Sequence, residues 1–143
     1  MILAHSQSIA REYSSSIMSI SILRGILICE YILGGLPRLT SWPLTSLHQK
    51  IHHKSQLTAP YLYPVFPFCQ QNRIKWHMSY VGALMLLEAL LLTLPQTRHS
   101  LITLFMNAFL TGAEWWSQMK AGLPYWLPIT NFFLGTFIFM MDM

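Results

Sequence analysis

Four apolar segments, each about as long as a membrane-spanning helix, dominate this sequence. They cover residues 17–36, 76–94, 100–119 and 123–141, and a helix of about 20 residues crosses the hydrocarbon core of a bilayer. Only 10% of the residues are charged, whereas soluble domains carry about 25%. We therefore predict an all-α fold, an integral membrane four-helix bundle that forms one domain over residues 1–143. A long loop over residues 37–75 would separate helices 1 and 2.

The first apolar segment contains a signal for the end of a helix. Gly34 and Gly35 are followed by Pro37, and glycine followed by proline is typical of a helix C-terminus. We therefore predict that the first helix ends at about residue 36.

The long loop is predicted to contain two different pieces. Leu44, Leu47 and Ile51 recur at helical spacing among basic residues, which indicates a short amphipathic helix lying on the membrane surface. The run from Pro60 to Phe68 alternates prolines with aromatic residues. Such a run cannot form a regular helix, and we expect it to form a stiff cap or lid over an opening of the bundle.

Histidines in the same loop raise one metal hypothesis. His48 and His52 are four residues apart, with His53 beside them, and an i, i+4 pair of histidines on a helix can bind zinc. No acidic residue stands close by, and a basic helix at a membrane interface explains the histidines without a metal. Cys29 and Cys69 show neither metal-type nor disulfide-type spacing. We therefore expect no metal and no other cofactor.

A polar stripe runs along the third apolar segment. Its side chains follow one another at spacings of three or four residues and fall within an arc of roughly 80° on a helix. In hydrocarbon this face must point into the bundle, where a carboxyl has to be neutral, paired or hydrated. Glu114 is therefore the first catalytic candidate, because lost solvation favours its protonated, proton-donating form. The stripe consists of Ser100, Thr103, Asn107, Thr111, Glu114 and Gln118.

Two interpretations of the stripe stay open. In the functional one, Asn107, Thr111 and Gln118 hold substrate or water beside Glu114, and Trp115 borders the same site. In the structural one, the hydroxyls bond back to their own helix and the small and polar residues hold two helices together.

The other buried acids give further candidates. Glu30 lies within the first segment and Glu88 in the middle of the second, so both are additional catalytic candidates. At about 1.5 Å per residue, Glu88 and Glu114 differ in depth by roughly 12 Å, and we expect no direct contact between them. His77 or Tyr80 is the better partner for Glu114 by the same counting.

Asn131, in the fourth segment, completes the set of candidate substrate-binding residues, because it can face the bundle. The substrate of such a site would be a lipophilic small molecule that enters from the membrane interface.

Loop charges suggest an orientation. The net charge of +4 is dispersed and does not resemble a nucleic-acid footprint, so we expect lipid and no nucleic acid as a partner. Basic residues concentrate in the loop over residues 37–75, and the positive-inside rule places this loop in the cytosol. We predict a multi-pass integral membrane protein, in the endoplasmic reticulum if the organism is eukaryotic.

Short motifs resemble those of the DoxX-like four-helix membrane proteins. They are L-R-G-x-L with G-G-L-P-R-L (residues 23–27 and 34–39), V-G-A-L-x-L-L-E-A-L-L-L with P-x-T-R (81–92 and 95–98), and A-G-L-P (121–124). The family includes subunits associated with quinone-linked sulfur oxidation. The proline-aromatic loop and the buried carboxyls are instead similar to small membrane proteins of fungal natural-product pathways, some of which are assigned epoxide-opening or cyclising chemistry.

Three classes of function follow from these features. The first is a cofactor-independent enzyme whose buried carboxyls open, hydrolyse, cyclise or isomerise a lipophilic polyketide or terpenoid epoxide or olefin. The second is a non-catalytic DoxX-like subunit or a partner protein that binds a quinone or another lipophile. The third is a transporter, which is disfavoured because no inverted repeat is evident. We expect the enzyme.

Overall fold

The computed structural model describes residues 2–63 and 73–142, and the side chains of residues 18–63 and 73–141. This part of the chain is helical and contains no strand, which confirms the all-α prediction. A four-helix membrane bundle stays a prediction. The helices are α1 (Ile2–Leu39), α2 (Thr45–Thr58), the short 3₁₀ helix η1 (Ala59–Leu62), α3 (Ile74–Thr93), α4 (Leu101–Lys120) and α5 (Trp126–Asp142).

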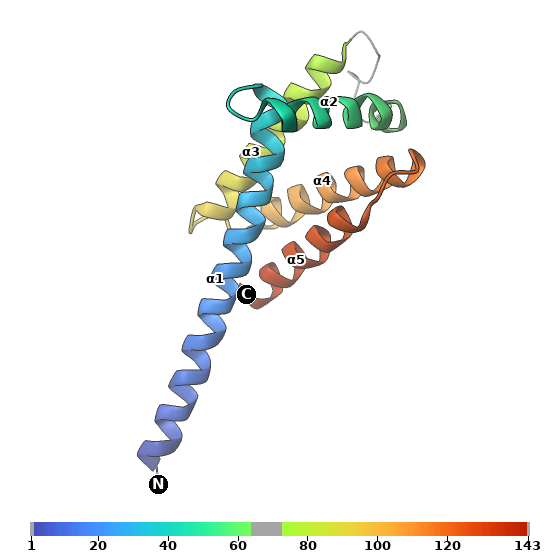
Figure 1. The fold of residues 1–143 in the computed structure, drawn as a ribbon. Coiled ribbons are helices and arrows are strands. Elements are labelled where there is room, and N and C mark those ends of the chain that lie inside the picture. Colours follow the sequence, from blue (N-terminus) through green and yellow to red (C-terminus); the bar gives the residue numbers. More distant parts are fainter. Residues whose placement is uncertain (1, 64–72, 143) are drawn as a thin grey trace.

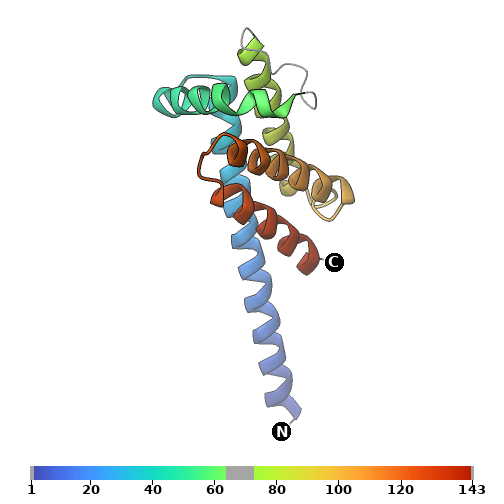
Figure 2. The ribbon, with the colours of Figure 1, turned by 90° about the vertical axis from the view of Figure 1, so that its right-hand side faces the viewer.

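The helices form two pairs and a cross-piece (Figure 1). α1 and α3 lie side by side, and α4 packs mainly on α5. The second pair is inclined to the first, and α2 crosses the end where α1 finishes and α3 begins (Figures 1 and 2). α4 is inclined to α3, so these two helices do not pack along their whole length (Figures 1 and 2). The N-terminal part of α1 projects beyond the other helices (Figure 2).

The apolar core lies where α1, α3, α4 and α5 meet. Its members come from all four helices, so this cluster holds the two inclined pairs together. The buried residues of the cluster are Leu27, Tyr31, Ala89, Leu92, Leu110 and Ile138.

The predicted end of the first helix is wrong. α1 continues through Pro37 to Leu39, and the two glycines serve close packing. A Cβ on Gly35 would lie 2.9 Å from the carbonyl oxygen of Gly82, and a Cβ on Gly82 would lie 2.9 Å from that of Gly35. The glycines therefore let α1 and α3 approach backbone to backbone, a use of small residues that is common between membrane helices.

The amphipathic helix predicted in the long loop is confirmed as α2. It covers Thr45–Thr58 and buries Ile51, Ser55 and Thr58 against the rest of the protein. This side faces the interior of the protein, and the placement of α2 on a membrane surface stays a prediction. Of the proline-aromatic run, Pro60 to Leu62 lie in η1, and residues 64–72 lie outside the described part.

Among the residues that the structure describes, two helices are long and apolar enough to cross a membrane. They are Met18–Leu39 within α1 and Ile74–Thr93, and Trp126–Met141 is a shorter apolar helix. Buried helices of soluble proteins can have the same length and composition. The multi-pass topology and the endoplasmic reticulum therefore remain predictions.

α4 buries polar side chains and exposes large apolar ones. Thr103, Asn107 and Thr111 of the predicted stripe are buried, whereas Ile102 is 68% and Phe105 75% exposed. The inward direction predicted for the stripe is thus confirmed for these residues.

Candidate functional site

A cavity of about 410 Å³ lies beneath α2 and is lined by residues of all five α-helices and η1. Its volume is in the range of small-molecule sites, roughly 300–1,000 Å³. Most of the wall is apolar, and Leu33, Ile51, Val81, Leu110 and Leu127 are among its residues. The space is therefore suited to a lipophilic molecule.

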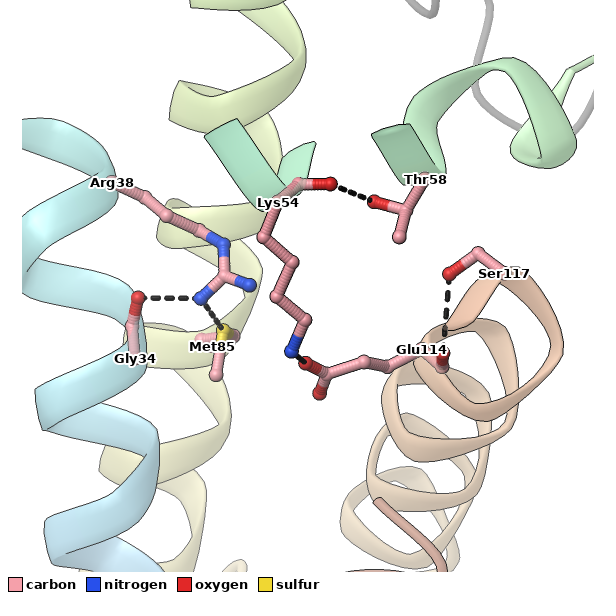
Figure 3. Close-up of polar contacts among 7 residues, drawn as sticks. All are labelled: Gly34, Arg38, Lys54, Thr58, Met85, Glu114 and Ser117. Atoms are coloured by element: carbon pink, nitrogen blue, oxygen red, sulfur yellow. Dashed lines mark hydrogen bonds and ion pairs between the residues drawn. The ribbon is translucent and has the colours of Figure 1, made fainter. Parts of the chain in front are cut away.

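An ion pair stands in the wall of this cavity. Lys54 Nζ of α2 lies 2.8 Å from Glu114 Oε1 of α4, and both side chains are about one-third exposed, at 34% and 29%. Each residue also has a side chain from its own helix bonded to its carbonyl oxygen, since Thr58 donates to Lys54 O at 3.0 Å and Ser117 to Glu114 O at 3.1 Å (Figure 3). The pair therefore links α2 to α4 at the cavity wall.

The ion pair corrects two expectations about Glu114. The partner in ion-pair contact is Lys54 and not His77 or Tyr80. Burial favours a neutral carboxyl, but an ammonium in contact favours the carboxylate. Glu114 is therefore half of a charged pair, and the expectation of an acid kept protonated by burial alone is wrong.

Arg38 contributes a second cation to the cavity. Its Nη1 donates to Gly34 O at 2.6 Å and contacts Met85 Sδ at 3.1 Å. The guanidinium points from α1 toward the side of the cavity where Lys54 meets Glu114 (Figure 3). The contact with Met85 links the Arg38 side chain to α3.

Four other predicted site residues line the same cavity. Glu30 and Asn131 each have a buried side-chain oxygen, Oε2 and Oδ1, without a hydrogen-bond partner among the described residues. His77 is buried at the wall. Thr111 also lines the cavity, and its hydroxyl donates to Asn107 O of its own helix at 2.6 Å. The last bond matches the structural interpretation of the stripe.

Glu88 and Asn107 are separate from this cavity. Glu88 is 0% exposed, and both carboxyl oxygens lack a partner among the described residues. With Asn107 and Gly135, it lines a second cavity of only about 10 Å³. Asn107 Oδ1 accepts a 2.7 Å bond from Tyr31 Oη, and its side chain packs against Gly135. Asn107 therefore links α4 to α1 and α5, and neither Asn107 nor Glu88 lines the large cavity.

Three further candidates lie away from the cavity wall. Tyr80 and Trp115 are exposed at the protein surface, and Gln118 is buried within the packing of α4. None of the three lines the 410 Å³ cavity.

The histidines of α2 were the candidate zinc ligands. Among the residues that the structure describes, no group of three or more His, Cys, Asp or Glu could hold a metal ion. His48 Nδ1 instead lies 2.5 Å from the carbonyl oxygen of Pro37 and so links α2 to the end of α1.

Sequence reasoning missed Arg38 and Lys54, which it counted only as charges that set orientation. A signal for Lys54 was present, because Leu47, Ile51 and Lys54 follow one another at spacings of four and three. They therefore share one side of a helix. All three line the cavity.

Comparisons with protein-family models, with curated proteins and with solved structures found no match to the chain. The resemblance to DoxX-like proteins therefore stays a prediction from short motifs.

Proposed function

We propose that this chain is a small integral membrane enzyme that carries out acid/base chemistry on a lipophilic molecule in the 410 Å³ cavity. The reaction is the opening, hydrolysis, cyclisation or isomerisation of a polyketide- or terpenoid-like compound. Glu114 and Lys54 transfer the protons, and no cofactor takes part. The observation that carries the proposal is the ion pair of 2.8 Å in the wall of a largely apolar cavity.

The membrane part of the proposal is supported by the reversed pattern of α4. Buried Thr103, Asn107 and Thr111 on a helix that exposes Ile102 and Phe105 are expected where the surroundings are lipid. Six aromatic residues near helix ends are also exposed, as in the belts at membrane interfaces. They are Trp42, Trp76, Trp115, Trp116, Tyr125 and Trp126.

The ion pair supplies both an acid and a base. For an epoxide, the Glu114 carboxylate takes a proton from water as the water oxygen bonds to a ring carbon and the carbon–oxygen bond of the ring breaks. The Lys54 ammonium protonates the departing oxygen. A proton then passes from Glu114 to the Lys54 amine across 2.8 Å, which restores the pair. The balance is one epoxide and one water converted to one diol.

The first step of the test is to purify the protein in mild detergent and to identify by mass spectrometry the lipophile that co-purifies with it. This lipophile is then supplied to the protein as substrate. Positioned proton transfer contributes about 10²- to 10⁴-fold to a rate. Glu114→Gln and Lys54→Gln should each lower turnover on that scale, and Lys50→Gln, an exposed change on the same helix, should not. A folded Glu114→Gln protein with the parent rate would refute the catalytic role.

A second candidate is a non-catalytic DoxX-like subunit or a lipophile- or quinone-binding partner protein. It is favoured by the hydroxyl of Thr111, which donates its hydrogen bond to Asn107 O of its own helix. A quinone that co-purifies with the protein and is not converted would favour this candidate.

A further inference from the structure

We propose that the cavity binds a single-chain amphiphile through a carboxylate head group, which Arg38 holds at the α2 end. This inference deepens the proposed function, since it names the chemical class of ligand for the same cavity. It rests on that function only in treating the ligand as a substrate. Binding itself can be measured without any turnover.

The guanidinium of Arg38 has free donors. An arginine carries five N–H donors in a planar fork that matches a carboxylate. The hydrogen bonds of Arg38 with described residues all use Nη1, which bonds Gly34 O and Met85 Sδ. Nε and Nη2 have no protein partner in the described part of the chain. These two nitrogens form the edge of the guanidinium that can donate one hydrogen bond to each oxygen of a carboxylate.

The charges at this end of the cavity are not balanced by the protein groups in contact there. Arg38 and Lys54 are two cations, and the one carboxylate in ion-pair contact with either of them, among the described residues, is Glu114. Two positive charges and one negative charge leave an excess of one positive charge. A charge that is partly removed from water is stabilised when it is paired. One anionic group completes the site.

The rest of the cavity can hold the apolar chain of such an amphiphile. Glu30 is eight residues before Arg38 on α1, so it lies roughly 12 Å further along the helix axis. The cavity wall is mostly apolar and includes Leu33, Val81 and Leu127, with the side chains of Glu30 and Asn131 as further polar groups. A molecule with one charged end and an apolar body therefore matches the cavity better than a compact polar anion.

The experiment measures binding to the full-length protein in nanodiscs of phosphatidylcholine, by titration with dodecanoate, its methyl ester and acetate. Dodecanoate should bind at least about 10-fold more tightly than the ester, because hydrogen bonds to a charged partner are worth about 10- to 100-fold in affinity. Acetate should not bind measurably. Arg38→Gln should remove the preference for the acid, and Arg38→Lys should retain part of it.

Arg73→Gln is the matched control, because Arg73 is exposed and does not line the cavity. Thermal unfolding of each variant identifies loss of fold, and Arg38→Lys keeps the test decisive if Arg38→Gln does not fold. Equal binding of acid and ester, or an acid preference that survives in folded Arg38→Gln, overturns the inference. Displacement of dodecanoate by phosphatidylglycerol assigns the site to membrane phospholipid and also overturns it. Failure of the acid preference leaves the Glu114 turnover test untouched, so the two proposals can fail separately.

Discussion

Lys54 Nζ lies 2.8 Å from Glu114 Oε1, and this contact joins α2 to α4 across 60 residues of chain. The cross-piece α2 is therefore held over the cavity by a charge pair as well as by the apolar contacts of Ile51. This arrangement makes the pair both a structural link and the proposed proton-transfer site.

Removing one member of the pair should destabilise the protein more than removing both. Lys54→Gln or Glu114→Gln leaves one charge without its partner, and the double variant leaves none. We expect a coupling of about 1 kcal/mol or less between the two changes, since both side chains are about one-third exposed. Unfolding of the four proteins in detergent measures this coupling, with Lys50→Gln as the control. Strictly additive effects would contradict an energetically relevant pair.

Gly82→Ala should weaken the packing of α1 on α3. A Cβ at this position would lie 2.8 Å from Cβ of Arg38 and 2.9 Å from the carbonyl oxygen of Gly35, so the helices must move apart. The expected loss is about 1–3 kcal/mol in the free energy of unfolding. Gly112→Ala is the control, because no atom lies within 4 Å of the Cβ added there. That control should be neutral or stabilising, as alanine favours helix by about 1 kcal/mol over glycine. Equal effects at the two positions would refute the close approach.

The hydroxyl of Tyr31 should stabilise the protein, because it bonds α1 to Asn107 of α4. It donates a buried 2.7 Å bond to Asn107 Oδ1, and Tyr31→Phe leaves that oxygen without the bond. We expect a loss of about 1–3 kcal/mol. Chemical unfolding in detergent is the measurement, with Tyr125→Phe at an exposed tyrosine as the control. No difference between the two variants would show that the bond is energetically unimportant.

The helices could be predicted from the sequence because the spacing of apolar and polar residues indicates both a helix and the side of it that is buried. The polar stripe of α4 was found this way, and Thr103, Asn107 and Thr111 are indeed buried. The end of α1 could not be predicted, because a pair of glycines such as Gly34 and Gly35 occurs both at the end of a helix and where two helices pack closely. Only the position of Gly82 on another helix distinguishes the two cases.

The candidate site could be predicted only in part. Glu114, Glu30, His77 and Asn131 were identified as buried polar groups in apolar segments, and they line one cavity. The partner of Glu114 could not be derived by counting depths along parallel helices, because α4 is inclined to α3 (Figures 1 and 2). Lys54 reaches Glu114 from α2, whose position over the bundle end is set by tertiary contacts.

Cys29 can report whether α1 is in a membrane. It is exposed on the protein surface and lies within the candidate span Met18–Leu39, so only lipid would shield it. A membrane-impermeant maleimide should therefore leave Cys29 unlabelled in intact membranes and label it after denaturation in detergent. A cysteine placed at the exposed Lys50 position is the accessible control. Rapid labelling of Cys29 in intact membranes would contradict the membrane assignment.

Cys69 lies outside the described part of the structure, and the sequence predicts that it lies in a cytosolic loop. The same reagent should label Cys69 in sealed microsomes, whose outer face is cytosolic. Labelling only after the vesicles are opened would reverse the orientation.

Proton transfer without redox chemistry fixes the mass relation between substrate and product. Cyclisation and isomerisation leave the molecular formula unchanged, and hydrolysis adds one water. The most direct measurement compares lipophilic metabolites, by high-resolution mass spectrometry, in the organism that carries the chain and in its Glu114→Gln variant at equal protein level. We predict that the variant accumulates a precursor whose formula equals that of the lost product or differs from it by one water. A precursor and product that differ in hydrogen or oxygen by any other amount, or unchanged metabolites, would contradict acid/base catalysis by this site.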